Sequence, residues 1–352
     1  KRVAAIDCGT NSIRLLIADL HEEHDDAERL RGDSDPRAPS VRLTDLTRQM
    51  RIVRLGEGVD RTGRLSAAAL ERTMTALSEY ARLIAEARPA AIRMVATSAT
   101  RDAANSREFT ERVTGILGVE PEVITGEEEA WLSFTGATRE LAGTSLQGEC
   151  GPPYLVTDIG GGSTEFVLGG TGAAGAPGAM PREQIRARSV NIGCVRLTER
   201  HLHGDPPLPA QIEATTKDID AALDEAAAGV PVEKARTLVG LAGSVTTVAA
   251  IALGLGEYDS TRIHHARISA ARVHEIAHRL LAMTRAERAA IPAMHPGRVD
   301  VIGGGALILD RIMTAFGFAE VLVSEHDILD GLIWSSVPCH PGDDPGTPRL
   351  SA

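Results

Sequence analysis

The sequence predicts two related α/β domains that face each other across a cleft. The chain has 352 residues, which is long for a single hydrophobic core and suits two domains. Apolar runs typical of strands alternate with amphipathic helical stretches along most of it. The pattern Asp-x-Gly-x-x-Ser follows an apolar strand twice, which indicates a duplicated unit. The matching residues are Asp7, Gly9 and Ser12 in the first copy and Asp158, Gly160 and Ser163 in the second.

Composition and charge argue against several classes of protein. The hydrophobic fraction of 43% allows a sizeable core, and the net charge of −11 argues against general nucleic-acid or membrane-surface binding. No close pair occurs among Cys8, Cys150, Cys194 and Cys339, so we expect reduced thiols and no zinc cluster. No signal peptide precedes the first strand and no apolar run reaches about 18 residues, so we expect a cytoplasmic protein.

The first domain is expected over residues 1–124. Its opening segment, RVAAIDCGTNSIRLLIADL, predicts a strand, a polar turn and a second strand, and therefore a hairpin. The charged stretch 21–40 is expected to be a solvated loop. Apolar residues at spacings of three and four predict a helix over 65–87. The other expected elements are strands at 50–59 and 120–125 and a strand that runs into a helix over 91–105.

The second domain is expected over residues 125–324. It opens with a helix at GEEEAWLSFTGA, and stretches rich in Gly and Pro at 143–153, 169–181 and 203–209 separate its elements. Further elements are helices at 210–228 and 270–290 and a strand that leads into a helix at 238–253. A short strand from residue 320 leads to a closing helix at about 325–337, with Ser324 as predicted N-cap and Asp327 as its reciprocal partner. The tail, 338–352, is expected to be disordered.

The two repeated turns are candidate phosphate sites. A turn made of Gly, Ser and Thr exposes backbone N–H groups that can bind phosphate oxygens. The alternative is that both are simply tight hairpin turns. The expected donors are Thr10, Asn11 and Ser12 in the first turn and Gly160, Gly161, Gly162 and Ser163 in the second.

Two aspartates stand where a strand meets its turn. A carboxylate beside phosphate oxygens is favourable when a cation lies between them, so Asp7 and Asp158 are candidate Mg²⁺ ligands. Alternatively, each aspartate caps the N–H groups of its own turn. Glu165 follows Ser163 by two residues, so strand alternation places it on the same face, towards the cleft. The alternative is that Glu165 is simply an exposed residue of the strand.

Three successive acids open the helix in TGEEEA. Thr125 and Glu128 match a capping box, and Glu127 interacts favourably with the helix dipole. Glu129 is the acid that capping does not require. A carboxylate beside a phosphate site can orient and deprotonate an attacking water, so Glu129 is the candidate base. The alternative is that Glu129 is simply a solvated residue at the start of the helix.

Basic residues near these turns can balance the charge of a phosphate. Arg14 shares a strand face with Ser12, Arg101 follows ATSAT near a helix start, and Arg196 follows NIGCV. Arginine binds phosphate strongly through paired hydrogen bonds, although single arginines are often only surface residues. The segment RIHHARIS carries a further basic group in which His264 and His265 are expected to make ordinary polar contacts rather than bind zinc.

A third strand-to-helix turn lies in GLAGSVTT. Gly243 and Ser244 open its helix and are candidates to bind another phosphate or part of a nucleotide. The similar segment IGGGAL at 302–307 is more typical of close helix packing.

Taken together, these segments resemble the exopolyphosphatase and guanosine pentaphosphate phosphohydrolase (Ppx/GppA) family. The resemblance extends over about residues 2–336 and rests on IDCGTNSIRLLI, VATSATRDAAN, GEEEAWLSF, TDIGGGSTEFV, NIGCVRLTE and GLAGSVTT in this order. It implies a pair of actin-like, ribonuclease-H-like domains with a central cleft, and a closing helix that returns to the first domain. Some members have a long helical C-terminal half, so this chain is similar to the short two-domain form.

The resemblance also implies roles for individual residues. Glu129 matches the family's catalytic base, Asp158 and Glu165 its metal-linked acids, and Arg14 and Arg101 its phosphate-binding arginines. The implied reaction is Mg²⁺- or Mn²⁺-dependent removal of the terminal phosphate from polyphosphate, with short chains expected as substrates. The implied assembly is a homodimer.

Three other functions stay open at this point. The first is hydrolysis of the 5′ phosphate of guanosine pentaphosphate in the same cleft. The second is an ATP-using kinase of the same superfold, in which GLAGSVTT would meet adenosine. The third is a non-catalytic sensor of polyphosphate or of an alarmone, against which the set Glu129, Asp158 and Glu165 argues.

Overall fold

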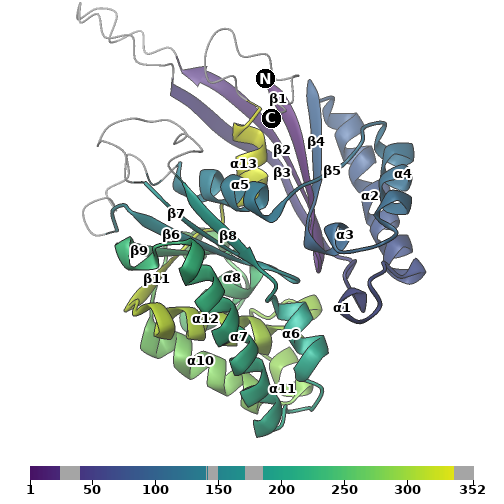
Figure 1. Ribbon diagram of the computed structural model, residues 1–352. Coiled ribbons are helices and arrows are strands. Elements are labelled where there is room, and N and C mark those ends of the chain that lie inside the picture. The colour runs from purple at the N-terminus through teal and green to yellow at the C-terminus, as the bar shows by residue number, and fades with distance from the viewer. Residues whose placement is uncertain (24–39, 140, 142–149, 171–184, 337–352) are drawn as a thin grey trace, which may run out of the picture.

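The fold contains two β-sheets with helices packed against them (Figure 1). The computed structural model describes residues 1–23, 40–139, 141, 150–170 and 185–336. The predicted tail at 338–352, most of the predicted loop at 21–40 and parts of the Gly- and Pro-rich stretches at 143–153 and 169–181 lie outside the described residues. Within the described part, no helix is both long enough and apolar enough to cross a membrane.

The first sheet is built on the predicted hairpin. Its strand order is β3-β2-β1-β4-β5, in which β1 pairs antiparallel with β2 and parallel with β4. The strands are β1 (Arg2–Cys8), β2 (Ser12–Glu23), β3 (Ser40–Ile52), β4 (Ala91–Ala96) and β5 (Glu122–Val123). Its helices are α1 (Val59–Thr62), α2 (Ala67–Ala87), α3 (Ser98–Arg101) and α4 (Ser106–Leu117). The apolar face of α2 covers the sheet through Leu70, Leu77 and Tyr80.

The second sheet repeats this topology. Its order is β10-β11-β9-β6-β7-β8, so β8-β7-β6-β9-β11 matches the first sheet strand for strand and β10 is an addition. The strands are β6 (Tyr154–Ile159), β7 (Thr164–Gly169), β8 (Arg186–Val190), β9 (Thr237–Leu241), β10 (Arg267–Ser269) and β11 (Glu320–Val323). The predicted duplication is therefore confirmed at the level of strand order and direction.

Most of the helices occur in the second half of the chain, before, between and after the strands of the second sheet. They are α5 (Gly126–Thr138), α6 (Cys194–His201), α7 (Pro209–Gly229), α8 (Ala242–Ala252), α9 (Ser260–Ile263), α10 (Ala270–Ala282), α11 (Arg285–Ala289), α12 (Ile302–Phe316) and α13 (Ile328–Trp334). Short 3₁₀ helices occur at Val232–Lys234 and Pro296–Arg298. The predicted close packing of IGGGAL is observed, because a Cβ atom on Gly305 would lie 2.2 Å from Ser244 Oγ.

Three local predictions were wrong. The expected helix at 270–290 is two helices, α10 and α11, because the backbone is extended at Met283 and Thr284 and Thr284 caps the second helix. The expected strand at 50–59 is instead the end of β3, which begins at Ser40 and ends at Ile52. Charged residues are tolerated along β3 because it is an edge strand whose pairing with β2 continues as far as Ser40. The N-cap of α13 is Asp327 rather than Ser324. The Asp327 carboxylate accepts a hydrogen bond from the Leu329 amide at 3.0 Å, whereas Ser324 bonds to His326 in the preceding turn.

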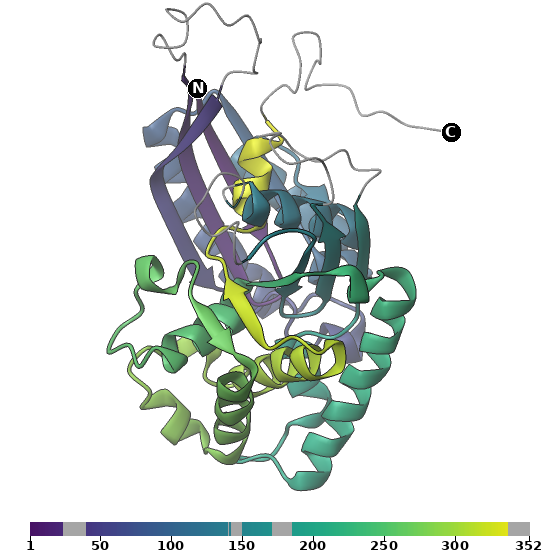
Figure 2. The same ribbon diagram turned by 90° about the vertical axis from the view of Figure 1, so that its left-hand side faces the viewer.

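Helices α5 and α13 cross between the two sheets. Helix α5 follows β5 of the first sheet and packs on β6, β7 and β8 of the second. Helix α13 follows β11 of the second sheet and packs on β1 and β2 of the first, and Figure 2 shows it in yellow beside these purple strands. A Cβ atom on Gly136 would lie 1.8 Å from Asp327 O, and one on Gly331 would lie 2.0 Å from Leu132 O. Glycine at both positions therefore lets the two helix backbones touch.

We expect Gly136→Ala to lower the free energy of unfolding by about 1–3 kcal/mol or more, because the new methyl group collides with the backbone of α13. Chemical denaturation measures this change. The matched control is Gly115→Ala in α4, where a Cβ atom would meet nothing within 4 Å. Equal stability of Gly136→Ala and Gly115→Ala would contradict this account of the crossing.

Candidate active site

The two repeated turns have the same backbone geometry. The Gly9 amide donates to Ser12 O at 2.9 Å, and the Gly160 amide donates to Ser163 O at 3.0 Å. The register is also the same, since Asp7 lies opposite Arg14 across its hairpin and Asp158 lies opposite Glu165. The repeat seen in the sequence therefore produces two equivalent turns, each with an acid at the end of its first strand.

Neighbouring segments hold the carbonyl groups of both turns. Thr10 O accepts from the Gly56 amide, and Asn11 O accepts from the amides of Val53 and Arg54. In the second turn, Gly160 O and Gly161 O accept from amides at the start of α6. Within the described residues, no protein acceptor is found for the amides of Thr10, Asn11 and Gly161. These N–H groups are available to an anionic ligand.

The two turns face each other and nearly touch. A Cβ atom on Gly161 would lie 2.9 Å from Thr10 Cβ, and one on Gly162 would lie 2.8 Å from Thr10 Oγ1. The second turn therefore requires glycine because of the first turn, as well as for its own conformation. Between them lies a cavity of about 90 Å³. Its lining includes Asp7, Thr10, Asn11, Ser12, Arg14, Glu129, Asp158, Gly160, Gly161, Ser163, Gly243, Ser244 and Arg298.

Three carboxylates, those of Asp7, Glu129 and Asp158, line this cavity, and the carboxylate of Glu165 interacts with that of Asp158 behind it. Asp7 and Asp158 come from the ends of β1 and β6, Glu165 from β7 and Glu129 from the first turn of α5. Asp158 accepts a hydrogen bond from Ser133 Oγ at 2.7 Å, and Glu165 accepts one from Ser189 Oγ at 2.7 Å. The side chains of Asp7, Asp158 and Glu165 are buried, and that of Glu129 is 12% exposed.

Burial and mutual repulsion raise the pKa of each of these acids. Burial raises the pKa of Asp158 to about 6 and that of Glu165 to about 8, and the charge of other acids adds to each shift. Burial, together with the charge of Glu165, raises the pKa of Glu129 well above its usual value. The pKa of Asp7 is also raised by burial, although Arg14 opposes this shift. The positive charge that the protein places near these acids therefore does not outweigh the effect of burial and mutual repulsion on their pKa values.

A divalent cation suits this cluster. Asp7 Oδ1 is buried and has no hydrogen-bond partner among the described residues, so one oxygen remains available as a ligand. Carboxylate oxygens are the donors that Mg²⁺ and Mn²⁺ prefer. The residues that could hold the ion are Asp7 and Asp158, with Glu165 behind Asp158 across the hairpin.

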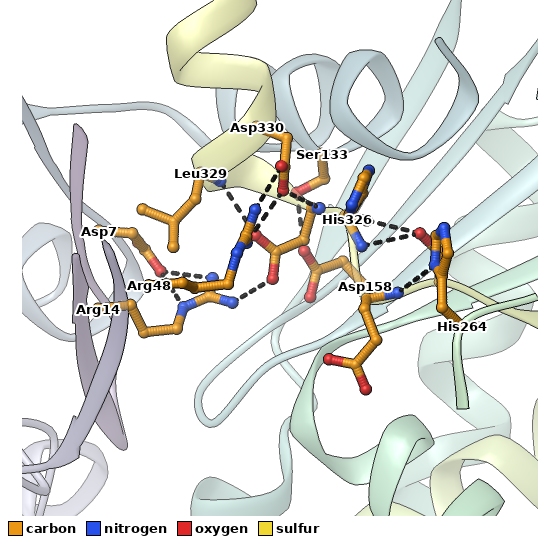
Figure 3. A network of polar contacts seen from close by, with 12 residues as sticks. Asp7, Arg14, Arg48, Ser133, Asp158, His264, His326, Leu329 and Asp330 are labelled. Atoms are coloured by element: carbon orange, nitrogen blue, oxygen red, sulfur yellow. Dashed lines mark hydrogen bonds and ion pairs between the residues drawn. The ribbon is translucent and has the colours of Figure 1, made fainter. Parts of the chain in front are cut away.

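The predicted arginines have different positions. Arg14 reaches from β2 to the carboxylates of Asp7, at 2.6 Å, and Asp327 (Figure 3). Arg101 contacts Glu129 Oε2 at 3.2 Å and is also bonded to Ile124 O. Of the three predicted arginines, only Arg14 lines the cavity, and neither Arg101 nor Arg196 does. The guanidinium of Arg196 donates to Gly162 O, Asp60 and Asp102, and so ties the outer side of the second turn to the first sheet's domain.

Sequence reasoning missed Arg298 and Ser133. Arg298 lies in the 3₁₀ helix before α12, and its side chain lines the cavity beside Gly243, where a Cβ atom would lie 2.3 Å from the guanidinium. No local motif marks Arg298 in the sequence. Ser133 occurs one turn after Glu129 on α5, and this spacing is the only sequence signal for it.

The histidine pair makes local contacts. The rings of His264 and His265 stack at 3.7 Å. His264, labelled in Figure 3, accepts a hydrogen bond at Nδ1 from the Glu325 amide. The two histidines lie near a second cavity of about 380 Å³, which shares Arg14, Gly243 and Arg298 with the first. Apolar and aromatic side chains contribute to its lining, among them Met50, Tyr258 and Met294.

Comparison with known proteins agrees with this geometry. The model of the Ppx/GppA phosphatase family matches residues 35–340. Exopolyphosphatase 2 of Mycobacterium tuberculosis (strain CDC 1551 / Oshkosh) is 46% identical over 95% of this chain and 98% of its own length. The crystal structure of an exopolyphosphatase-like protein has a TM-score of 0.82, with 42% identity over 95% of this chain and 98% of that one. The structure of the Aquifex aeolicus PPX-GPPA enzyme has a TM-score of 0.70, with 29% identity over 95% of this chain and 99% of that one. The predicted duplicated, actin-like fold is confirmed.

The raised pKa values predict a pH-dependent stability. In the metal-free protein, Asp158 and Glu165 bind their protons more tightly in the folded state than in the unfolded state. Protonation of these two acids therefore stabilises the folded state, and this stabilisation is complete at low pH. It is lost as the pH rises through about 6 and about 8. We expect Mg²⁺ to raise the unfolding temperature more at pH 8 than at pH 6, because the ion binds the ionised acids. Thermal unfolding of wild type with and without Mg²⁺ at pH 6 and at pH 8 measures this difference. Glu165→Gln is the comparison variant, because it lacks one of the two acids. An equal Mg²⁺ effect at both pH values in wild type would contradict this expectation.

Proposed function

The chain belongs to the Ppx/GppA phosphatase family, and we propose that it is an exopolyphosphatase. Its substrate is inorganic polyphosphate, from which it releases the terminal phosphate as orthophosphate, with short chains preferred. The name of the 46% identical relative, which aligns over 95% of this chain, supports this substrate. The observation that carries the proposal is the position of a buried carboxylate cluster directly beside two turns with available amides.

The proposed cofactor is Mg²⁺ or Mn²⁺, held by Asp7, Asp158 and Glu165. When bound, the ion offsets the negative charge of the phosphate oxygens and of the acids. The partnerless oxygen of Asp7 and the raised pKa values of Asp158 and Glu165 support this assignment.

The two turns and nearby arginines bind the terminal phosphates. Backbone amides of Thr10, Asn11 and Gly161 donate to phosphate oxygens, because no protein acceptor is found for them among the described residues, whereas the predicted donor Gly160 uses its amide within its own turn. Arg14 and Arg298 add positive charge to the same cavity. Gly243 and Ser244, at the start of α8, line another side of this cavity. Since Arg196 is engaged by two aspartates and a carbonyl, its role is to position the second turn.

Glu129 is the proposed base that orients and deprotonates the attacking water. Its carboxylate lines the cavity, and burial gives it a raised pKa, which makes it a stronger proton acceptor than an exposed glutamate. Arg101 holds the carboxylate through a contact of 3.2 Å. With the phosphate fixed by the turns, the protein's contribution is mainly positioning and charge stabilisation.

One observation favours a second candidate function, the hydrolysis of guanosine pentaphosphate. The cavity of about 380 Å³ that adjoins the phosphate site is large enough for a nucleoside, and Tyr258 and Met294 provide contact surface for a base. A homodimer, which rests on the family resemblance, and a cytoplasmic location, which rests on the sequence, are part of the proposal.

We expect Glu129→Gln to lower the rate of phosphate release by about 10²–10⁴-fold, because it removes the proton acceptor and keeps the shape of the side chain. Colorimetric detection of phosphate from short polyphosphate with Mg²⁺ measures the rate. The matched control is Glu127→Gln, which changes an exposed acid in the same turn of α5. If Glu129→Gln and Glu127→Gln release phosphate equally fast, the assignment of the base is wrong.

We expect faster phosphate release from short polyphosphate than from long polyphosphate or guanosine pentaphosphate when kcat/KM is compared with Mg²⁺ present. Tyr258→Ala should slow the reaction of guanosine pentaphosphate alone, because the side chain lines only the second cavity. A higher kcat/KM for guanosine pentaphosphate would favour the second candidate function over the first.

A further inference from the structure

A separate group of metal-binding side chains lies between helices α10 and α12. His274 and His278 project from α10, and Asp310 projects from the adjacent α12. These helices lie between β10 and β11 along the chain and pack side by side (Figure 1), and none of the three residues lines the catalytic cavity. One ligand atom of each residue lies within 4.8 Å of the other two. We infer that His274, His278 and Asp310 form a binding site for a transition-metal ion of the Zn²⁺ type.

The spacing of the two histidines suits a shared ion. They are four residues apart on one helix face, and the segment HEIAH has the H-E-x-x-H spacing used by zinc-binding helices. Their ring centroids are 4.2 Å apart. His274 Nδ1 lies 3.1 Å from Asp310 Oδ1. Two ligand atoms that share a tetrahedral Zn²⁺ lie about 3.3 Å apart, since each bond is about 2.0–2.1 Å long. Small rotations of the rings are enough to place three ligands around one ion.

The burial of Asp310 gives a second, independent reason. Asp310 is 4% exposed, and within the described structure its carboxylate has hydrogen bonds with His274 alone. A buried carboxylate needs a strong positive partner. The adjacent Arg311 does not provide it, because its guanidinium is paired with Asp220 at 2.9 Å. Both histidines are exposed, so an ion and its water ligands can enter from solvent.

The donor set selects a different metal from the catalytic cluster. Two imidazoles and one carboxylate favour Zn²⁺, Co²⁺ or Ni²⁺, whereas the catalytic acids offer oxygen alone and favour Mg²⁺ or Mn²⁺. Glu275 lies between the histidines in sequence, but its carboxylate pairs with Arg272 at 2.6 Å on an exposed surface. We therefore assign the bound ion the role of cross-linking helices α10 and α12, and not a role in hydrolysis. Ile302, at the start of α12, lines the catalytic cavity, so the ion would fix a helix that supports the active site.

Titration with Zn²⁺ or Co²⁺ in excess Mg²⁺ tests this inference. We expect wild type to bind Co²⁺ with visible absorption bands, and to bind Zn²⁺ in competition with a chelating dye. His278→Gln and Asp310→Ala should each weaken binding by at least about tenfold, because each removes a ligand. The control is His203→Ala, which removes an exposed histidine elsewhere and should leave binding unchanged. Zn²⁺ should raise the unfolding temperature of wild type more than that of His278→Gln.

Two results would overturn the site: no binding of Zn²⁺ or Co²⁺ by wild type, or equal affinity in wild type and His278→Gln. Because His278 is exposed, the folding of this variant is not at risk. Phosphate release with Mg²⁺ should be unchanged in His278→Gln. The outcome is therefore independent of whether the proposed phosphatase activity is correct.

Discussion

The structure depends on the burial of four carboxylates whose ionisation is disfavoured until positive charge is added. Asp7, Asp158 and Glu165 are buried, Glu129 is nearly so, and each has a raised pKa. Such an arrangement costs folding free energy in the metal-free protein. In the proposed mechanism a divalent cation offsets this cost, so the unfavourable burial of the acids in the metal-free protein strengthens the binding of the metal. A polyanionic substrate can then approach acids that would otherwise repel it.

Duplication of one topology explains how the acids come together. Each sheet ends its central strand in an aspartate followed by a turn, and the two turns meet so closely that Gly161 has no room for a side chain. The crossing of α5 and α13 links the halves at backbone contact through Gly136 and Gly331. Helix α5 carries Glu129 at its start, so the element that joins the halves also positions the proposed base.

Local patterns predicted the turns well, because Asp-x-Gly-x-x-Ser specifies a turn without help from distant residues. Long-range partners were not predictable in this way. One of the two carboxylate partners of Arg14 is Asp327, 313 residues away, and Arg298 reaches the cavity from a segment without a motif. The N-cap of α13 was misassigned to Ser324 for the same reason, since Asp327 is held in place by Arg14. The spacing of His274 and His278 is visible in the sequence, but Asp310 is brought to it only by helix packing.

Diffraction from crystals grown with Mn²⁺ and phosphate tests the central claim most directly, because the anomalous signal locates the metal. The account predicts a Mn²⁺ peak coordinated by carboxylate oxygens of Asp7 and Asp158, with phosphate oxygens bound by the amides of Thr10 and Gly161. A Mn²⁺ peak away from both aspartates, or a phosphate bound between the turns without any metal beside it, would contradict the account.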